Sequence, residues 1–196
     1  MTVSIFKTEL EITFPFALLI ALLLCCDKTG MMSVSLLAVI IHETGHLIAL
    51  YAFKLPPRKI SLRICGIQIV QTRLFESTAA QITVAAAGPV ANLIASLVLL
   101  PLSSYRFCAT LCACGLVIGL FNLLPLYELD GGDILRCLLS LRLDPKTVRI
   151  VSGTVNAVIL ILLAISGVLI FISPSHNPTM LIAAVYLLLY VIIKHR

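Results

Sequence analysis

Six long apolar runs, separated by short polar or turn-rich segments, dominate the 196-residue chain. Because about 20 apolar residues cross a hydrocarbon core of roughly 30 Å, this pattern predicts about six transmembrane helices. We therefore expect an all-α polytopic membrane protein, with a single membrane-embedded domain over residues 1–196. The runs are residues 12–26, 31–53, 78–102, 107–126, 150–172 and 179–193.

One segment between the second and third runs has a different period. Residues 59–73 alternate polar and apolar side chains around Gly66 and are rich in β-branched residues, a pattern typical of a β-hairpin. Because open sheet edges are not tolerated against lipid, the hairpin must be interfacial, or re-entrant and covered by protein. Its edge could pair with an extended peptide. A solvated turn is the alternative.

Composition and charge agree with a membrane protein. Hydrophobic residues make up 60% of the chain and charged residues 12%, outside the range of soluble globular proteins. In the six-span arrangement only Lys28 and Arg106, of the 14 Lys and Arg, lie on the side opposite the termini. Cytoplasmic loops are rich in Lys and Arg, so we expect a multi-pass protein of the cell membrane with both termini cytoplasmic. The net charge of +5 then needs no nucleic-acid partner.

Titratable residues interrupt the second apolar run. His42, Glu43 and His46 lie near its middle, where such groups are costly unless they have a function. Histidines four residues apart project from one face of a helix, so both imidazoles can reach one metal ion. The sequence H-E-T-G-H is the pattern of zinc metalloproteases, in which the glutamate lies beside the metal.

A third metal ligand is expected after the fourth run. A catalytic zinc usually takes three protein ligands and leaves the fourth position to water. Asp130 is the carboxylate that we favour, because the flexible Gly131 and Gly132 would let the chain fold back against the second run. Glu128 and Asp133 are also near and are interpreted as interface charges.

The third run also contains residues that are unusual in an apolar helix. Pro89 frees backbone groups that need partners, and Asn92 needs hydrogen bonds. By themselves these residues favour a kinked packing helix with a polar contact to a neighbouring helix.

Three motifs together resemble the site-2 protease family of intramembrane zinc metalloproteases. Residues 42–46 match its H-E-x-x-H helix, residues 88–92 its G-P-x-x-N element and residues 122–131 its N-x-x-P-x-x-x-L-D-G element, in the family's order. Within that family the chain resembles the short six-span branch that includes the sporulation protease releasing a sigma factor. We expect a catalytic core at about 31–135, without the CBS domain of that branch or the PDZ insertion of another.

The resemblance implies specific roles for five residues. His42, His46 and Asp130 would bind zinc, Glu43 would be the general base, and Asn122 would orient the substrate backbone or stabilise the oxyanion. The implied activity is hydrolysis of transmembrane or membrane-associated proteins near the cytoplasmic face of the bilayer. The implied setting is regulated proteolysis of a sigma or anti-sigma factor, with control by a membrane partner left open.

Two other functions would also place such residues in a membrane. A catalytically silent member that binds transmembrane segments would keep the fold, but the intact His42, Glu43, His46 and Asp130 argue against it. A metal transporter would distribute its ligands along a pathway or over repeated halves, and neither pattern is present in the sequence.

Overall fold

The computed structural model describes residues 2–5, 8–63, 66–71, 75, 77–173 and 179–194. The chain forms two compact units, Met1–Asn122 and Leu123–Arg196, each of which is described by itself. The first unit contains β1 (Thr2–Ile5), β2 (Thr8–Ile12), α1 (Phe14–Cys26), α2 (Met31–Ala52), β3 (Pro57–Arg63), β4 (Gly66–Gln71), α3 (Thr78–Leu99), the 3₁₀ turn η1 (Leu100–Leu102) and α4 (Arg106–Asn122). The second unit contains α5 (Asp130–Ser140), α6 (Pro145–Ile172) and α7 (Thr179–Lys194).

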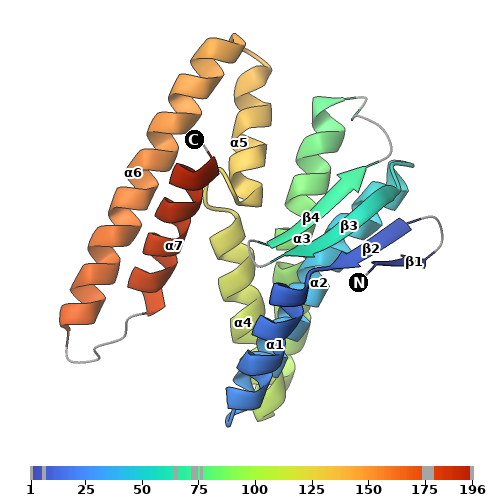
Figure 1. Cartoon of the computed structure of the whole chain (residues 1–196), viewed down its shortest axis with the longest axis vertical. Coiled ribbons are helices and arrows are strands. Elements are labelled where there is room, and N and C mark those ends of the chain that lie inside the picture. Colours follow the sequence, from blue (N-terminus) through green and yellow to red (C-terminus); the bar gives the residue numbers. More distant parts are fainter. Residues whose placement is uncertain are drawn as a thin grey trace. The chain divides into compact units, whose positions relative to one another are not determined.

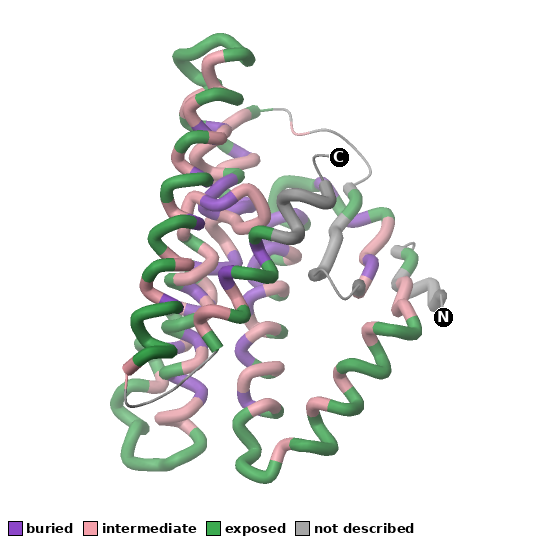
Figure 2. The backbone as a smooth tube through the Cα atoms, turned by 60° about the vertical axis from the view of Figure 1, so that its left-hand side comes forward, coloured by how far each residue is buried: buried purple, intermediate pink, exposed green. Residues whose placement is uncertain are grey.

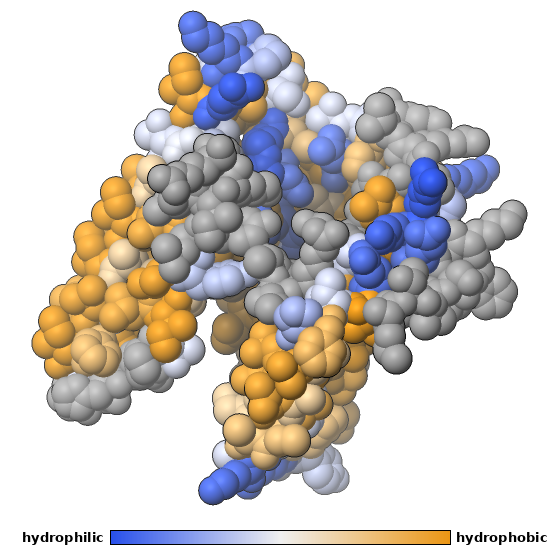
Figure 3. Space-filling view, in the orientation of Figure 1, coloured by the Kyte–Doolittle hydropathy of each residue, from blue (hydrophilic) through white to orange (hydrophobic). Residues whose placement is uncertain are grey.

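Each of the six predicted apolar runs contains a helix. Among the described residues, Met31–Ala52, Thr78–Leu102 and Pro145–Ile172 are long and apolar enough to cross a membrane, and Phe14–Cys26, Arg106–Asn122 and Thr179–Leu188 are shorter apolar helices. Apolar side chains cover the flanks of the helices, while hydrophilic side chains gather at helix ends and on the sheet (Figure 3). The predicted fold class, a helical membrane protein with a small β-structure, is confirmed.

The first helix is shorter than the first apolar run. α1 begins at Phe14 rather than at residue 12, and its 13 residues rise about 20 Å, less than the thickness of a hydrocarbon core. The preceding residues are held by β3, because the backbone N–H and the hydroxyl of Thr13 both donate to the carbonyl of Leu62, at 3.2 and 3.0 Å. All residues of α1 are described and none is buried; Figure 2 shows this helix diverging from its successor.

The predicted hairpin is present within a larger sheet. β3 and β4 pair antiparallel with Arg63 opposite Gly66, and the strand order is β1-β2-β3-β4 (Figure 1). β2 runs parallel to β3, and the Glu11 carboxylate joins them through an ion pair with Lys59 at 3.0 Å and a hydrogen bond from the Ser61 hydroxyl at 3.1 Å. The alternation pattern missed β1 and β2 because both are very short. β4 is an edge of the described sheet.

α2, α3 and α4 pack closely in the first unit. A Cβ at Gly45 of α2 would lie 2.7 Å from the Cβ of Ala91, and a Cβ at Gly119 of α4 would lie 3.2 Å from the carbonyl oxygen of Pro89. Small residues allow helix backbones in membranes to approach at this distance. The core residues around these contacts are Ala49, Leu50, Leu55 and Val84 in one cluster and Val34, Ala38 and Leu111 in another.

The second unit begins where the fourth run was expected to continue. α4 ends at Asn122, four residues before the predicted end, and Pro125 cannot extend a helix. The helix α5 was not predicted, although Ile134, Leu135 and Leu138 have the spacing of an apolar helix face. Both α5 and α7 pack against α6 (Figure 1).

Candidate active site

His42 and His46 are buried on one face of α2. They are 5% and 9% exposed, and their Nε2 atoms lie 3.2 Å apart. The ring centroids are 4.9 Å apart with the ring planes at 77°. The α-helical spacing of four residues explains why both rings lie on the same face. The pair therefore presents two imidazole nitrogens toward one point.

Groups on α3 contact the other nitrogen of each ring. Nδ1 of His46 lies 2.8 Å from the backbone carbonyl oxygen of Val84. Because a carbonyl oxygen can only accept a hydrogen bond, Nδ1 of His46 is the donor. Nδ1 of His42 lies 3.4 Å from the side-chain amide of Asn92, which is fully buried. The contact with Val84 orients the ring of His46 and selects the tautomer that leaves its Nε2 available, while Asn92 contacts the corresponding nitrogen of His42.

Gly88 leaves the space beside both Nε2 atoms open. A Cβ built at this position would lie 2.8 Å from Nε2 of His42 and 2.7 Å from Cε1 of His46. Any side chain at position 88 would therefore collide with the two rings. The G-P-x-x-N element thus needs glycine at position 88 for a steric reason, which the sequence pattern did not reveal.

The donors of this unit fit the zinc ion that the resemblance implies. Zinc binds neutral imidazole nitrogens, and His46 has its ring proton on Nδ1, which leaves the Nε2 lone pair for a metal. His42 supplies a second Nε2 within 3.2 Å, and Gly88 contributes no atom that would block it. Two such nitrogens, facing each other in a buried place, are suited to zinc.

Glu43 and Asn122 belong to the same unit. Glu43 is half-buried and follows His42 directly on α2, whereas its neighbour Thr44 is exposed and donates to the carbonyl of Ile40 at 2.7 Å. Asn122 is half-buried at the end of α4, where Nδ2 donates to the carbonyl of Ile118 at 2.9 Å. The structure thus brings His42, His46 and Asn92 into contact and places Asn122 on a different helix.

Asp130 begins α5 in the second unit, after a segment of tight turns, residues 123–129, that we call the Asp130 turn. The interpretation that Gly131 and Gly132 serve as flexible residues is wrong, because both are helical. A Cβ at Gly131 would lie 2.5 Å from the carbonyl oxygen of Leu124, and one at Gly132 would lie 2.6 Å from the carbonyl carbon of Leu126. Both glycines are needed because the turn packs directly on α5.

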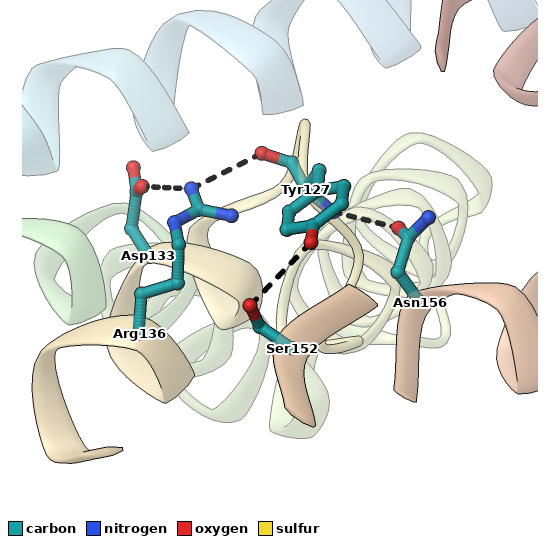
Figure 4. A network of polar contacts seen from close by, with 5 residues as sticks. All are labelled: Tyr127, Asp133, Arg136, Ser152 and Asn156. Atoms are coloured by element: carbon teal, nitrogen blue, oxygen red, sulfur yellow. Dashed lines mark hydrogen bonds and ion pairs between the residues drawn. The ribbon is translucent and has the colours of Figure 1, made fainter. Parts of the chain in front are cut away.

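Tyr127 is the centre of a polar network in this unit (Figure 4). Its backbone N–H donates to Oδ1 of Asn156 at 2.9 Å, and its carbonyl accepts from Nη2 of Arg136 at 3.2 Å. Arg136 also pairs with Asp133, and its guanidinium lies 5.2 Å from the centre of the Tyr127 ring. Asn156 was missed by the sequence patterns; its only signal is an asparagine within a strongly apolar run.

Comparisons with known proteins find similarity to one peptidase family. The family model for peptidase family M50 matches residues 102–165. A zinc metalloprotease of Methanocaldococcus jannaschii is 31% identical over 111 residues, which cover 53% of this chain and 32% of that relative. The match thus spans about a third of the length of this curated relative.

A solved structure has the same fold. The site-2 protease from Methanocaldococcus jannaschii superposes with a TM-score of 0.69 and 21% sequence identity, covering 95% of this chain and 91% of that chain. Together with the apolar helices, the family match makes this chain a membrane-embedded protein. The family model, the curated relative and the shared fold thus agree that this chain is similar to peptidase family M50 and to a site-2 protease.

Proposed function

We propose that the chain is a zinc metalloendopeptidase that hydrolyses peptide bonds of transmembrane or membrane-associated proteins. The observation that carries this proposal is the buried pair of His42 and His46, whose Nε2 atoms lie 3.2 Å apart on an apolar helix that also carries Glu43. Two imidazole nitrogens and a neighbouring carboxylate are the parts of a zinc protease helix. The curated relative is itself a zinc metalloprotease.

His42, His46 and Asp130 would hold the zinc. Two histidines and one carboxylate are a common catalytic set, which leaves a fourth position for water. Support for Asp130 comes from its place in the N-x-x-P-x-x-x-L-D-G element, which lies within the residues that match the M50 family model. The alternative Asp133 is engaged by Arg136 in an ion pair, which favours Asp130 further.

Glu43 is the proposed general base and general acid. When bound, zinc lowers the pKa of its water ligand toward neutrality and polarises the substrate carbonyl. Glu43 takes the proton of the attacking water and then delivers it to the amine nitrogen of the leaving peptide. A C–O bond forms, the peptide C–N bond breaks, and the proton ends on the new amino group.

Asn122 is the proposed partner of the substrate backbone. Its Nδ2 group carries two hydrogens, of which the carbonyl of Ile118 accepts one. The other is available to a substrate carbonyl or to the oxyanion that forms at that oxygen, where a fixed donor stabilises the transition state.

The edge strand β4 supports a proposal for substrate docking. An extended peptide can add to an exposed sheet edge through main-chain hydrogen bonds, and β4 lies at the edge of the described sheet. The substrate helix must unwind near the cleaved bond, because its peptide groups are otherwise bonded within the helix and shielded by side chains. The unwound segment would then lie along β4.

The proposed setting is the cytoplasmic face of the cell membrane, with both termini of this chain in the cytoplasm. The bias of Lys and Arg toward that side supports this orientation. By resemblance to the sporulation protease, a sigma or anti-sigma factor is the proposed substrate, and a membrane partner would regulate access to it.

Cleavage of a co-expressed panel of membrane-tethered sigma and anti-sigma candidates tests the proposal. Wild type is compared with Glu43→Gln and with Thr44→Val, a matched change at the exposed neighbour, and zinc is quantified in each purified protein. We expect Glu43→Gln to abolish cleavage while retaining zinc, and Thr44→Val to behave as wild type.

Other outcomes separate the alternatives. Cleavage that persists in Glu43→Gln would refute the general-base role. A folded wild-type protein that binds no zinc would favour a catalytically silent binding protein. Zinc uptake into proteoliposomes that survives Glu43→Gln would favour a transporter, because transport does not need a proton acceptor for water.

A further inference from the structure

Tyr127 lies in the middle of the Asp130 turn, three residues before Asp130. The N–H of Leu126 donates to the carbonyl of Leu124 at 2.7 Å just before it, and the N–H of Leu129 donates to the carbonyl of Leu126 at 3.1 Å across it. The N–H of Tyr127 instead donates to Oδ1 of Asn156, 29 residues further along the chain, at 2.9 Å (Figure 4). The conformation of the turn therefore depends on a side chain of α6.

Asn156 differs from other polar residues of α6. The hydroxyls of Thr154 and Ser166 donate to carbonyls of their own helix, at Ile150 and Leu162. Asn156 is only 4% exposed and reaches the backbone of another segment. A buried amide is costly in an apolar helix unless it is bonded, and its bond to a backbone N–H satisfies a group that the turn leaves open.

Three further contacts hold the same residue. The carbonyl of Tyr127 accepts from Arg136, and the guanidinium of Arg136 also lies over the aromatic ring. The Ser152 hydroxyl lies 3.5 Å from the phenol oxygen. Tyr127 is thus held at its N–H, its carbonyl and its ring, in contact with both α5 and α6.

The Asp130 turn packs on the first turn of α5 without intervening side chains. Its carbonyl groups lie so near Gly131 and Gly132 that neither position has space for a Cβ. Asp130 is the first residue of the same helix. A displacement of the turn would therefore displace Asp130 as well.

We infer that Asn156 is a positioning residue for Asp130. Its side-chain oxygen accepts a hydrogen bond from the backbone N–H of Tyr127 and thereby fixes the conformation of the Asp130 turn and the position of the Asp130 carboxylate. This inference rests on the proposed role of Asp130 as the third zinc ligand. Asn156 does not touch metal or substrate. It acts through the backbone of the turn.

Zinc affinity of the purified full chain, measured by chelator competition, tests this inference. Asn156→Leu removes the acceptor at similar volume, Asn156→Asp keeps an acceptor oxygen, and Ser166→Ala is the control on the same helix. We expect Asn156→Leu to weaken zinc affinity by about 10- to 100-fold, the range for residues that orient metal ligands. Asn156→Asp and Ser166→Ala should stay close to wild type.

A second readout separates positioning from general stability. The visible spectrum of bound Co²⁺ reports the ligand set, and we expect it to change in Asn156→Leu and to return to the wild-type form in Asn156→Asp. If Asn156→Leu does not fold, the smaller Asn156→Ala, which also lacks the acceptor, takes its place. Wild-type affinity and spectrum in the folded variant without the acceptor would overturn the inference.

Asp130→Asn distinguishes this result from a failure of the proposed function. If Asp130→Asn loses zinc while the variant without the acceptor keeps it, Asn156 does not position the ligand, and the assignment of Asp130 still holds. If Asp130→Asn binds zinc as wild type does, Asp130 is not a ligand, and both the ligand set and the role of Asn156 are refuted.

Discussion

Gly88 of α3 lies directly against the imidazole of His46, so that a Cβ at position 88 would come within 2.7 Å of Cε1 in that ring. The same Cβ would lie 2.8 Å from Nε2 of His42. Real Cβ atoms do not approach other atoms so closely, and the buried rings cannot move aside without losing their contacts. The space beside the two nitrogens therefore exists only because residue 88 is glycine.

Gly88→Ala should remove zinc binding. The added methyl group would displace both rings from the point toward which their Nε2 atoms are directed. The measurement is zinc content after purification, together with the thermal unfolding midpoint. Gly115→Ala is the control, because its Cβ would meet the Ser96 hydroxyl at 2.5 Å in the packing between α3 and α4. Equal loss of zinc in both variants would assign the effect to packing.

Asn92→Leu should weaken zinc binding about 10- to 100-fold, as expected for a residue that orients a metal ligand. His42 can bind through Nε2 only when Nδ1 carries the ring proton, and that N–H then needs an acceptor. Oδ1 of Asn92 has no hydrogen-bond partner among the described residues, and rotation of the amide would direct it at His42.

Asn92→Asp should keep zinc affinity near the wild-type value, since a carboxylate oxygen accepts the same hydrogen. Ser96→Ala, one turn further along α3, removes a hydroxyl that donates to the carbonyl of Cys112 at 3.0 Å and should leave zinc unaffected. Chelator competition on all three variants checks the prediction. Equal affinity in the Leu and Asp variants would contradict it.

Asp144→Ala should destabilise the start of α6 at neutral pH but not in acid. Hydrogen bonds from the side chain and backbone of Thr147 hold the pKa of Asp144 below its usual value of 3.8. The stabilisation is therefore fully present above pH 3.8 and is lost as the pH falls through the lower folded-state pKa.

Thermal unfolding of wild type and Asp144→Ala between pH 7 and pH 3 measures this effect. The difference between their midpoints should shrink as the pH falls below 3.8. Asp144→Asn retains a side-chain acceptor for the first turn and should lose less stability at pH 7 than the alanine variant. A difference that does not change with pH would assign the effect to side-chain contacts other than the ionised cap.

Cys137 should react slowly with alkylating reagents in the folded protein. Burial raises the pKa of the thiol, and the charge of Asp133 raises it further, although Arg136 acts in the opposite direction. Because the thiolate is the reactive form, we expect little modification at pH 7.5 until the protein is unfolded. Mass spectrometry of the peptide that contains Cys137 measures the rate. Equally fast labelling before and after unfolding would contradict the packing of α5.

The spacing of residues close in the sequence was enough to predict the helical framework and part of the candidate active site. The apolar runs predicted the three long apolar helices and the three shorter ones, because burial in lipid requires long uninterrupted apolar sequences. The four-residue interval between His42 and His46 predicted their common face, since helix geometry relates residues that are close in sequence. The β3–β4 hairpin was predicted for the same reason: its two strands are neighbours in the chain, and their side chains alternate.

Contacts between distant residues decided the rest. The acceptor for His46 is the carbonyl of Val84, 38 residues away, and every residue type has a carbonyl, so no sequence pattern could identify it. Asn92 reaches His42 over 50 residues and Asn156 reaches Tyr127 over 29. Such pairings arise from helix packing, which depends on the shapes of all the buried side chains together. The chain's local patterns therefore predicted which residues could bind metal, and tertiary packing determined how each is held.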